Sequence, residues 1–445
     1  MEIILKNGHI VDPSSGLDTI GHVVIQDDKI AQIAPLSEEL QISTQTQVID
    51  AGGLYVFPGF VDIHVHLREP GFTHKETIAS GTQAGVKGGF TTLCCMPNTN
   101  PPNDNETITQ YIVQKGLSGG SGSYPTLRGG QGGVCNVHPI GAITKNQAGK
   151  ELTEFGLMKA AGCVAFSDDG RPVTNSLLMR RALEYSTTFD VPVISHAEDV
   201  WLSGDGVMNE GQLSTLLGLR GIPAEAEVIM IRRDIELAAL TGGRLHIAHV
   251  STAGGVRAIR EAKAAGINVT AETTPHYLHI TEDCVKGYNT LAKVNPPLRT
   301  KKDVEAVREG ICDGTIDCIV TDHAPHHKDD KECEFDVAAF GISGLETALA
   351  LGLRLVQEGV LSLSALIEKM TVKPSDILGL GKGTLTEGAV ADVVVVDIDR
   401  EFTVDMNSLV SKGRNTPFHG WQLKGLCVLT IVGGAIRYDQ LRGSL

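Results

Sequence analysis

The sequence predicts an α/β protein in which a (β/α)8 TIM barrel is joined to a small β-sandwich domain formed from both chain termini. Eight apolar runs that alternate with stretches of helical spacing predict the barrel. The two chain ends, which both read as short strands separated by turns, predict the sandwich. A barrel takes about 250 residues, so a chain of 445 residues leaves room for a second domain. We expect the sandwich at 1–55 plus 381–445 and the barrel at 56–380.

The terminal segments are rich in β-branched residues and are interrupted by Gly, Asp and Pro. At the N-terminal end they are IILKNGHIVD, HVVIQDDKIAQI and QVIDAGGLYVFPG, and at the C-terminal end ADVVVVDIDREFTV and LKGLCVLTIVGGAIRYD. β-Branched residues favour strands, and the interrupting residues favour turns. Because both chain ends share this pattern of strands and turns and the middle of the chain does not, we predict one sheet domain built from both ends.

The eight apolar runs are the predicted strands of the barrel. They are VFPGFVDI, GFTTLCCM, VCNVHPI, CVAFSD, VPVISH, RLHIAHV, INVTAET and TIDCIVTD. Near-continuous apolar runs are typical of parallel strands covered on the outside, and segments such as AEAEVIMIRRDIELAAL supply the helical spacing between them. Eight units favour a closed barrel, with an open doubly wound sheet as the alternative.

Composition excludes several classes of function. A net charge of −15 argues against binding to nucleic acid or to anionic membranes, and no stretch approaches 18 uninterrupted apolar residues. Nine cysteines without a C-x-x-C motif indicate reduced thiols. We therefore expect a soluble cytoplasmic protein. The glycine-rich segment Gly116–Gly133 reads as a flexible surface insertion.

Ionisable side chains gather where the predicted strands end. These residues are His64, His66, Asp168, Asp169, His196, His249, Asp322 and His323. The C-terminal ends of barrel strands converge on one face, where active sites are built. A lone His is more often structural, and Asp-Asp-Gly is also a turn sequence, but five strand ends with the same chemistry favour a metal site.

The spacing of these residues suits divalent cations. In a strand His64 and His66 share one face, so both imidazoles can bind one ion. Carboxylates can bridge two ions, and mixed His and Asp ligands suit zinc or another first-row metal. Such ions polarise a carbonyl and acidify water, as amide hydrolysis requires.

Other polar residues near the strand ends offer hydrogen-bond donors to a substrate. Arg68, Asn98 and Asn295 could bind a substrate carboxylate, or they could be loop-capping groups. His22, His246 and His279 lack this placement, and we interpret them as structural.

Seven motifs give the chain a family resemblance. FVDIHVHLREPG, CMPNT, AFSDDG, HAED, AHVST, PPLR and TDHAPH resemble the dihydroorotases, specifically the bacterial type I branch of the amidohydrolase superfamily. The resemblance implies reversible cyclisation of N-carbamoyl-L-aspartate to L-dihydroorotate in pyrimidine (UMP) biosynthesis. Family members commonly have HCED where this chain has HAED, a change that spares the histidine.

The resemblance also implies a set of metal ligands, with one or two zinc ions. By position, His64, His66 and Asp322 would hold one zinc, and His196 and His249 the second. Asp169 would bridge them, with Asp168 as the alternative. Hydantoinases, allantoinases and type II dihydroorotases use a carboxylated lysine as the bridge, but the run CVAFSD contains no lysine.

The same resemblance implies roles toward substrate. Asp322 would act as the general base, and His66 would lie against the substrate. The residues around the substrate carboxylate and ring would be Arg68, Asn98, Asn295, His326, Phe340 and Gly341. The charged loop from His323 to Phe340 is a candidate lid, with a solvated surface loop as the alternative.

Two other functions stay open from the sequence. One is a different cyclic-amide hydrolase, such as a hydantoinase or an allantoinase. The other is a non-catalytic dihydroorotase-like scaffold for aspartate transcarbamoylase, although all six ligand positions are filled here. The expected partners are the small-molecule substrate, a second copy in a homodimer, and aspartate transcarbamoylase.

Overall fold

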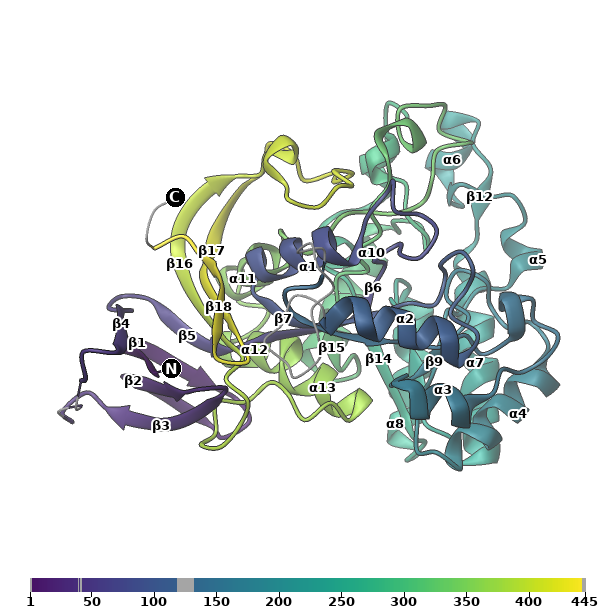
Figure 1. Cartoon of the computed structure of the whole chain (residues 1–445). Helices are drawn as coiled ribbons and strands as arrows, with labels where there is room; N and C mark the ends of the chain where they lie inside the picture. Colours follow the sequence, from purple (N-terminus) through teal and green to yellow (C-terminus); the bar gives the residue numbers. More distant parts are fainter. Residues whose placement is uncertain (1, 39, 41, 118–131, 442–445) are drawn as a thin grey trace.

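The structure is a computed structural model that describes residues 2–38, 40, 42–117 and 132–441. Most of the predicted insertion at 116–133 therefore lies outside the described residues. Within them the strands of the two chain ends lie side by side, and the middle of the chain forms a separate α/β unit (Figure 1). Among the described helices, none is both long enough and apolar enough to span a lipid bilayer.

The two chain ends share one sheet, which has eight strands within the described residues. Its order is β18 (Ala435–Asp439), β17 (Gln422–Val432), β16 (Val393–Thr403), β5 (Tyr55–Pro58), β1 (Glu2–Asp12), β2 (Leu17–Gln26) and β3 (Lys29–Pro35), and β4 (Thr46–Asp50) pairs with β1. The junction is β5, which runs antiparallel to β16 and parallel to β1. The terminal segments thus form a single sheet domain, as their shared texture predicts.

Within the described residues the middle of the chain supplies ten further strands, eight of which form two parallel sheets. A three-stranded sheet contains β6 (Phe60–Val65), β7 (Phe90–Cys95) and β8 (Asn136–Pro139). A five-stranded sheet contains β9 (Phe166–Ser167), β10 (Val193–Ser195), β13 (Leu245–Ile247), β14 (Val269–Thr273) and β15 (Cys318–Ile319). Single parallel bridges connect Val65 to His323 and Gly141 to Phe166, so the two sheets meet at both edges.

The first apolar run is divided between the terminal sheet and the three-stranded parallel sheet. Residues 55–58 form β5 in the terminal sheet, and β6 begins at Phe60. Between them, a Cβ atom on Gly59 would lie 2.2 Å from Thr91 Oγ1, so only glycine fits there. The run looks continuous because both strands are buried, and periodicity within one run does not show a change of sheet.

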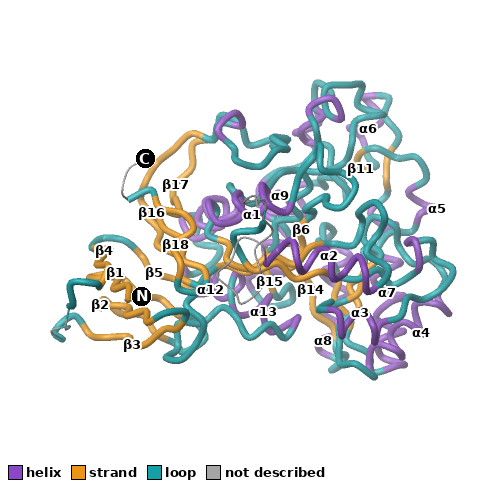
Figure 2. The backbone as a smooth tube through the Cα atoms, in the orientation of Figure 1, coloured by secondary structure: helices purple, strands orange, loops and turns teal. Residues whose placement is uncertain are grey.

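Helices cover the outside of the parallel strands (Figure 2). Those of seven or more residues are α1 (Ile78–Lys87), α2 (Glu106–Leu117), α3 (Phe155–Ala161), α4 (Ser176–Thr187), α7 (Ala224–Thr241), α8 (Ala253–Ala264), α10 (Lys301–Cys312), α11 (Ala348–Gln357), α12 (Leu363–Met370) and α13 (Val372–Leu378). Shorter elements near the site are α5 (Val200–Ser203), α6 (Gln212–Leu217), α9 (Pro275–His279), β11 (Met208–Asn209) and β12 (Gly221–Ile222). The start of α4 follows from its sequence, because the Asn175 side chain accepts hydrogen bonds from the N–H groups of Leu177 and Leu178.

A compact apolar cluster fills the space enclosed by the parallel strands. Its fully buried members are Val61, Ile63, Cys94, Met96, Ile140, Ala165, Ile194, Ala248, Cys318 and Val320. They come from the strands or from the residues directly before or after them, so the interior is packed rather than open. The polar residues at the strand ends therefore lie next to these packed apolar side chains.

Candidate metal centre and active site

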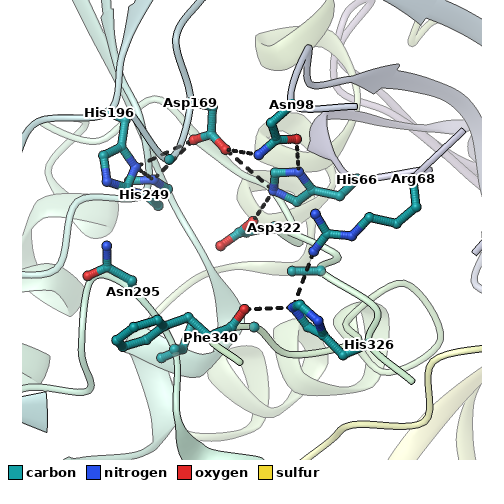
Figure 3. Close-up of a pocket in the computed structure, with 14 residues that line it drawn as sticks. His66, Arg68, Asn98, Asp169, His196, His249, Asn295, Asp322, His326 and Phe340 are labelled. Atoms are coloured by element: carbon teal, nitrogen blue, oxygen red, sulfur yellow. Dashed lines mark hydrogen bonds and ion pairs between the residues drawn. The ribbon is translucent and has the colours of Figure 1, made fainter. Parts of the chain in front are cut away.

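A cavity of about 220 Å³ opens at the C-terminal ends of the parallel strands. Its lining contains every predicted site residue except His64: His66, Arg68, Asn98, Asp169, His196, His249, Asn295, Asp322, His326, Phe340 and Gly341 (Figure 3). His64 has no exposed surface and contacts the same carboxylates from below the cavity floor. The structure thus brings all the predicted site residues together.

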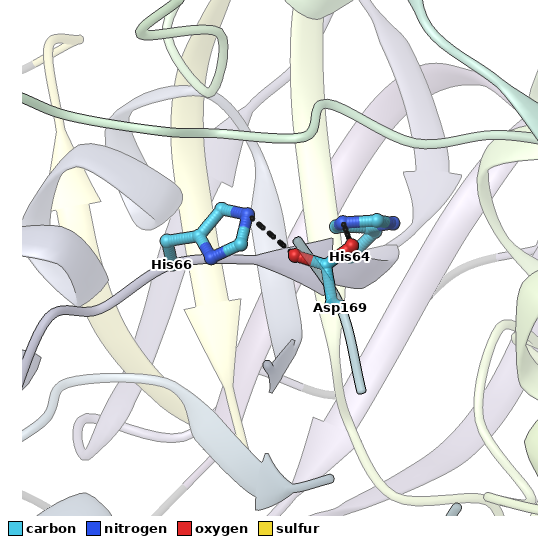
Figure 4. A group of neighbouring side chains, drawn as sticks. All are labelled: His64, His66 and Asp169. Atoms are coloured by element: carbon cyan, nitrogen blue, oxygen red, sulfur yellow. Dashed lines mark ion pairs between the residues drawn. The ribbon is translucent and has the colours of Figure 1, made fainter. Parts of the chain in front are cut away.

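The two histidines of the H-x-H pair face Asp169 and Asp322. His64 Nε2 lies 3.4 Å from Asp169 Oδ1 and 3.5 Å from Asp322 Oδ1. His66 Nε2 lies 3.6 Å from Asp169 Oδ2 (Figure 4). It also lies 3.0 Å from Asp322 Oδ1. Four ligands about 2.0–2.2 Å from a tetrahedral zinc are roughly 3.2–3.6 Å apart, so these four groups fit one ion.

A second group lies on the other side of Asp169. Asp169 Oδ1 is 3.5 Å from His196 Nδ1 and 3.6 Å from His249 Nε2. The two imidazole nitrogens are 2.9 Å apart. Asp169, His196 and His249 therefore form a second set of ligand atoms that could hold an ion.

One carboxylate belongs to both groups, and it is that of Asp169. The neighbouring Asp168 points elsewhere: its Oδ1 accepts from Thr144 N at 3.0 Å and its Oδ2 accepts from Thr144 Oγ1. Among the described side chains, Asp169 Oδ1 and His64 Nε2 are buried atoms that make no hydrogen bond. Unpaired buried polar atoms are costly, and a cation between these two atoms would satisfy both.

Side chains outside the two metal groups hydrogen-bond to three of the four histidines and orient their rings. His64 Nδ1 lies 2.5 Å from Glu272 Oε1, and His196 Nε2 lies 3.0 Å from Glu198 Oε2. The Asn98 side-chain oxygen accepts from His66 Nδ1 at 2.8 Å. Such contacts fix the tautomer and leave the opposite ring nitrogen free to face the metal.

Burial and charge set the protonation of this cluster. Burial alone would lower the pKa of His196, but the carboxylates of Asp169 and Glu198 outweigh it and raise that pKa to about 10. Glu272, Asp169 and Asp322 similarly hold the pKa of His64 well above its usual value. Without a cation, protons therefore balance the carboxylates, and a divalent ion must compete with them.

Arg68, His326 and Phe340 form a second cluster of predicted substrate residues along the cavity, whereas Asn98 lies beside Asp169 and donates to its Oδ2 at 3.2 Å (Figure 3). Arg68 Nε donates to the Pro325 carbonyl at 3.2 Å. His326 Nε2 donates to the Phe340 carbonyl at 2.8 Å, and Lys75 Nζ lies 3.2 Å from His326 Nδ1. Burial, then Arg68 and Lys75, lower the pKa of His326 to about 2, so its ring is neutral. A neutral ring held on both nitrogens is fixed in orientation.

The comparisons with known proteins can be set beside this geometry. Residues 53–254 match a family model described as "Dihydro-orotase-like". A dihydroorotase from Geobacter metallireducens is 51% identical over 440 residues, which cover 99% of this chain and all of that protein. A dihydroorotase from Syntrophotalea carbinolica is 53% identical over 438 residues, covering 98% and 99% of the two chains. This chain belongs to the dihydroorotase family.

Solved structures place this dihydroorotase-family chain among cyclic amidohydrolases. An L-hydantoinase (dihydropyrimidinase) from Arthrobacter aurescens superposes with a TM-score of 0.85 at 27% identity, covering 98% of this chain and 96% of that one. A dihydropyrimidinase from Brevibacillus agri superposes with a TM-score of 0.83 at 23% identity, covering 99% and 95%. The second likeness concerns the fold alone.

The sequence of this dihydroorotase-family member did not reveal every residue that shapes the site. Glu272 is the last residue but one of the seventh apolar run, so its position near the strand end was a usable signal. It lies between His64 and His246, whose Nε2 is 3.0 Å from Glu272 Oε2. Glu198, two residues after His196, also receives a hydrogen bond from Asn295 at 3.0 Å. His246 bonds to Glu272, which in turn contacts the predicted ligand His64.

Two buried lysines bond to backbone carbonyls in and next to the loop 323–340, which the sequence predicts to be a lid. Lys331 Nζ donates to the carbonyls of Thr290 and Lys293 at 3.1 and 3.0 Å, and to that of Ala339 at 2.6 Å. Lys293 Nζ donates to the Phe335 carbonyl at 2.7 Å and lies 4.5 Å from the centre of the Phe340 ring. Ammonium groups that satisfy loop carbonyls hold the loop over the cavity. Its opening stays a prediction.

Proposed function

We propose that this chain is a metal-dependent dihydroorotase, which interconverts N-carbamoyl-L-aspartate and L-dihydroorotate in pyrimidine biosynthesis. Near-full-length identity of 51–53% to proteins named dihydroorotase carries the proposal. The ligand geometry supports it, because both metal groups share an aspartate and the run CVAFSD contains no lysine that could bridge them.

We propose zinc as the metal, bound as a pair. His64, His66 and Asp322 would hold one ion, His196 and His249 the other, and Asp169 both. The donor set supports this, since imidazole and carboxylate without thiolate suit zinc. When bound, the ions would polarise the amide carbonyl and make water a better nucleophile.

Asp322 is the proposed general base. In ring opening its carboxylate accepts a proton as water forms the new C–O bond, and it passes that proton to the ring nitrogen as the C–N bond breaks. Cyclisation runs the same transfers in reverse. Although burial opposes ionisation, His64 and His66 hold the pKa of Asp322 below its usual value, so the carboxylate is ionised at neutral pH.

The substrate carboxylate is proposed to lie on the far side of the cavity from the metals. Arg68 provides a guanidinium there, and His326 provides a further polar group. Asn98 and Asn295, which bond to Asp169 and Glu198, would contact the substrate nearer the metals. The backbone at Phe340 and Gly341 would contact the ring. His66 would lie at the boundary between substrate and metal.

Several further features are proposed on the same basis. We infer a closed barrel at 56–380 and a two-layered sandwich at 1–55 plus 381–445. A separate apolar cluster that includes Ile3, Val23, Val56, Val393 and Leu429 supports the sandwich, since it joins both halves of the terminal sheet. We also propose a cytoplasmic enzyme that forms a homodimer or binds aspartate transcarbamoylase.

A substrate panel tests the proposed activity. The purified protein, loaded with zinc, would be assayed for ring opening of dihydroorotate, hydantoin and allantoin. We expect turnover with dihydroorotate and at least about 100-fold lower kcat/KM with the other two, because their rings lack its carboxylate. A preference for hydantoin would favour the rival suggested by the L-hydantoinase structure. No turnover with any ring would favour the scaffold role.

Proton release on metal binding is a second expected result. His196 must lose its proton before Nδ1 can bind an ion, and its pKa of about 10 keeps that proton in place at neutral pH. Zinc affinity of chelator-stripped protein should therefore rise with pH. Calorimetry near pH 7.5, in two buffers of different ionisation enthalpy, should show at least about one proton released per protein. Binding without proton release would contradict the protonation described above.

The raised pKa of His196 also predicts how the stability of the chelator-stripped protein changes with pH. The folded pKa of His196, about 10, lies above the unfolded value of about 6.5. The stabilisation from its protonated form is therefore complete below about pH 6.5 and is lost as the pH rises toward about 10. The Tm of stripped protein should fall across this window more steeply than that of zinc-loaded protein.

A further inference from the structure

The segment 404–421, which connects β16 to β17, leaves the terminal sheet and packs against the rim of the site (Figure 1). Ser411 Oγ donates to the buried Glu76 carboxylate at 2.6 Å. Ser343 Oγ donates to the Gly413 carbonyl at 2.8 Å. The predicted sandwich domain thus reaches the active-site rim, which nothing in the sequence pattern indicated.

Asn415 makes the most extensive of these contacts. Its Oδ1 accepts from His326 N at 2.9 Å and from Ser343 Oγ at 3.0 Å. Its Nδ2 donates to the carbonyls of Ala324 and Gly341, each at 3.0 Å. The side chain is only 3% exposed, so these four bonds form without competing water.

The four bonds leave no freedom in how the amide is placed. A primary amide has two N–H donors, and both are used here. Its oxygen accepts from His326 N and shares the single Ser343 hydroxyl proton with the Gly413 carbonyl. Turning the amide over would set its NH2 group against the His326 N–H. A shorter side chain would leave buried backbone groups of His326, Ala324 and Gly341 without partners.

The backbone that Asn415 holds carries two proposed substrate contacts. His326 and Gly341 lie on opposite ends of the loop 323–341, and both line the 220 Å³ cavity. Through Asn415 the two ends are joined on the side away from the cavity, while the His326 ring donates to the Phe340 carbonyl on the other. The Asn415 amide therefore holds the spacing between the two ends together with the backbone bond from Ala324 N to the Ile342 carbonyl at 2.9 Å.

Close approach of the two segments requires glycine at two positions. A Cβ atom on Gly413 would lie 2.4 Å from Pro325 Cβ and 2.7 Å from His326 N. Gly341 has a φ of +145° and a Cβ there would lie 2.7 Å from the Ala324 carbonyl oxygen. Both glycines permit the spacing at which the amide of Asn415 can bridge the two ends.

We propose that Asn415 is a positioning residue for substrate binding, which holds His326 and Gly341 at the separation that the substrate requires. This inference rests on the proposed dihydroorotase function. None of the four bonds of the Asn415 amide involves a metal-ligand side chain. Loss of the amide should therefore weaken substrate binding while leaving the metals and the general base in place.

The test is Asn415→Ala, with Asn407→Ala as its matched control. Asn407 lies in the same connection, is exposed, and bonds only within it, to Asp405 Oδ1 at 3.1 Å. For Asn415→Ala we expect the KM for dihydroorotate to rise at least about tenfold while kcat changes less than about threefold, with unchanged zinc content. Asn407→Ala should match the unsubstituted protein. A KM within twofold of that protein in folded Asn415→Ala would overturn the proposal.

A second variant and a second measurement keep the outcome decisive. Asn415→Asp has the same shape, leaves no cavity and keeps the acceptor for His326 N; once protonated, its second oxygen can still donate to one of the two carbonyls. It loses at least one of the donors to Ala324 and Gly341, and its KM should also rise. If the unsubstituted protein does not turn over dihydroorotate, the proposed function fails. Backbone hydrogen exchange in residues 323–343 then tests whether Asn415 positions this loop. Faster exchange in Asn415→Asp than in Asn407→Ala supports that role, and equal exchange overturns it.

Discussion

Asp322→Asn is expected to lower kcat for dihydroorotate by at least roughly 10³-fold, in both directions of the reaction. Asparagine keeps the size of the side chain but cannot accept a proton at neutral pH. It also removes a negative charge 3.0 Å from His66 Nε2 and 3.5 Å from His64 Nε2. Proton transfer and one metal site are therefore both weakened by one change.

The measurement for Asp322→Asn is steady-state turnover together with metal content and thermal unfolding. The fold should persist, because the buried apolar cluster beneath the site is untouched. A folded variant that retains zinc and still turns over dihydroorotate at close to the normal rate would show that another group is the base.

Asp169→Asn is expected to have the second largest effect, a fall in kcat/KM of more than about 100-fold with loss of at least one metal per protein. Asp169 is the carboxylate that faces all four histidines, at separations of 3.4–3.6 Å. An amide offers one acceptor oxygen in place of two charged ones. Neither metal group would then keep its full charge.

Asp168→Asn is the matched control for that prediction. Asp168 is equally buried and adjacent in sequence, but its carboxylate bonds to Thr144. Asparagine keeps one acceptor for Thr144, so we expect about 1 kcal/mol of lost stability and nearly normal turnover. The reverse pattern, with Asp168→Asn inactive and Asp169→Asn active, would exchange the roles of the two aspartates.

The proposed metal ligands could be predicted from the sequence because they lie at the C-terminal ends of the parallel strands or a few residues after them. His196 and His249 follow β10 and β13, and Asp322 follows β15, so the convergence of parallel strands brings them together without knowledge of any loop. Asp169 could be preferred to Asp168 only by resemblance. Local pattern alone gives both residues the same position.

Which ligand each supporting residue contacts could not be predicted in this way. Glu272 contacts His64 from 208 positions away, and Asn415 contacts His326 from 89 positions away. Such pairings depend on how elements far apart in the sequence pack together, and neither residue type nor hydrophobic periodicity indicates that packing. The division of the first run at Gly59 was hidden for the same reason, since both halves are equally apolar.

Removal and return of the metal, followed by the rate of dihydroorotate ring opening, tests the central claim most directly. Protein stripped with a chelator should lose its turnover, and added zinc should restore it in a titration that saturates at about two equivalents per chain. Stripped protein that keeps full activity, or zinc-loaded protein that does not act on dihydroorotate, would contradict a metal-dependent dihydroorotase built around Asp169.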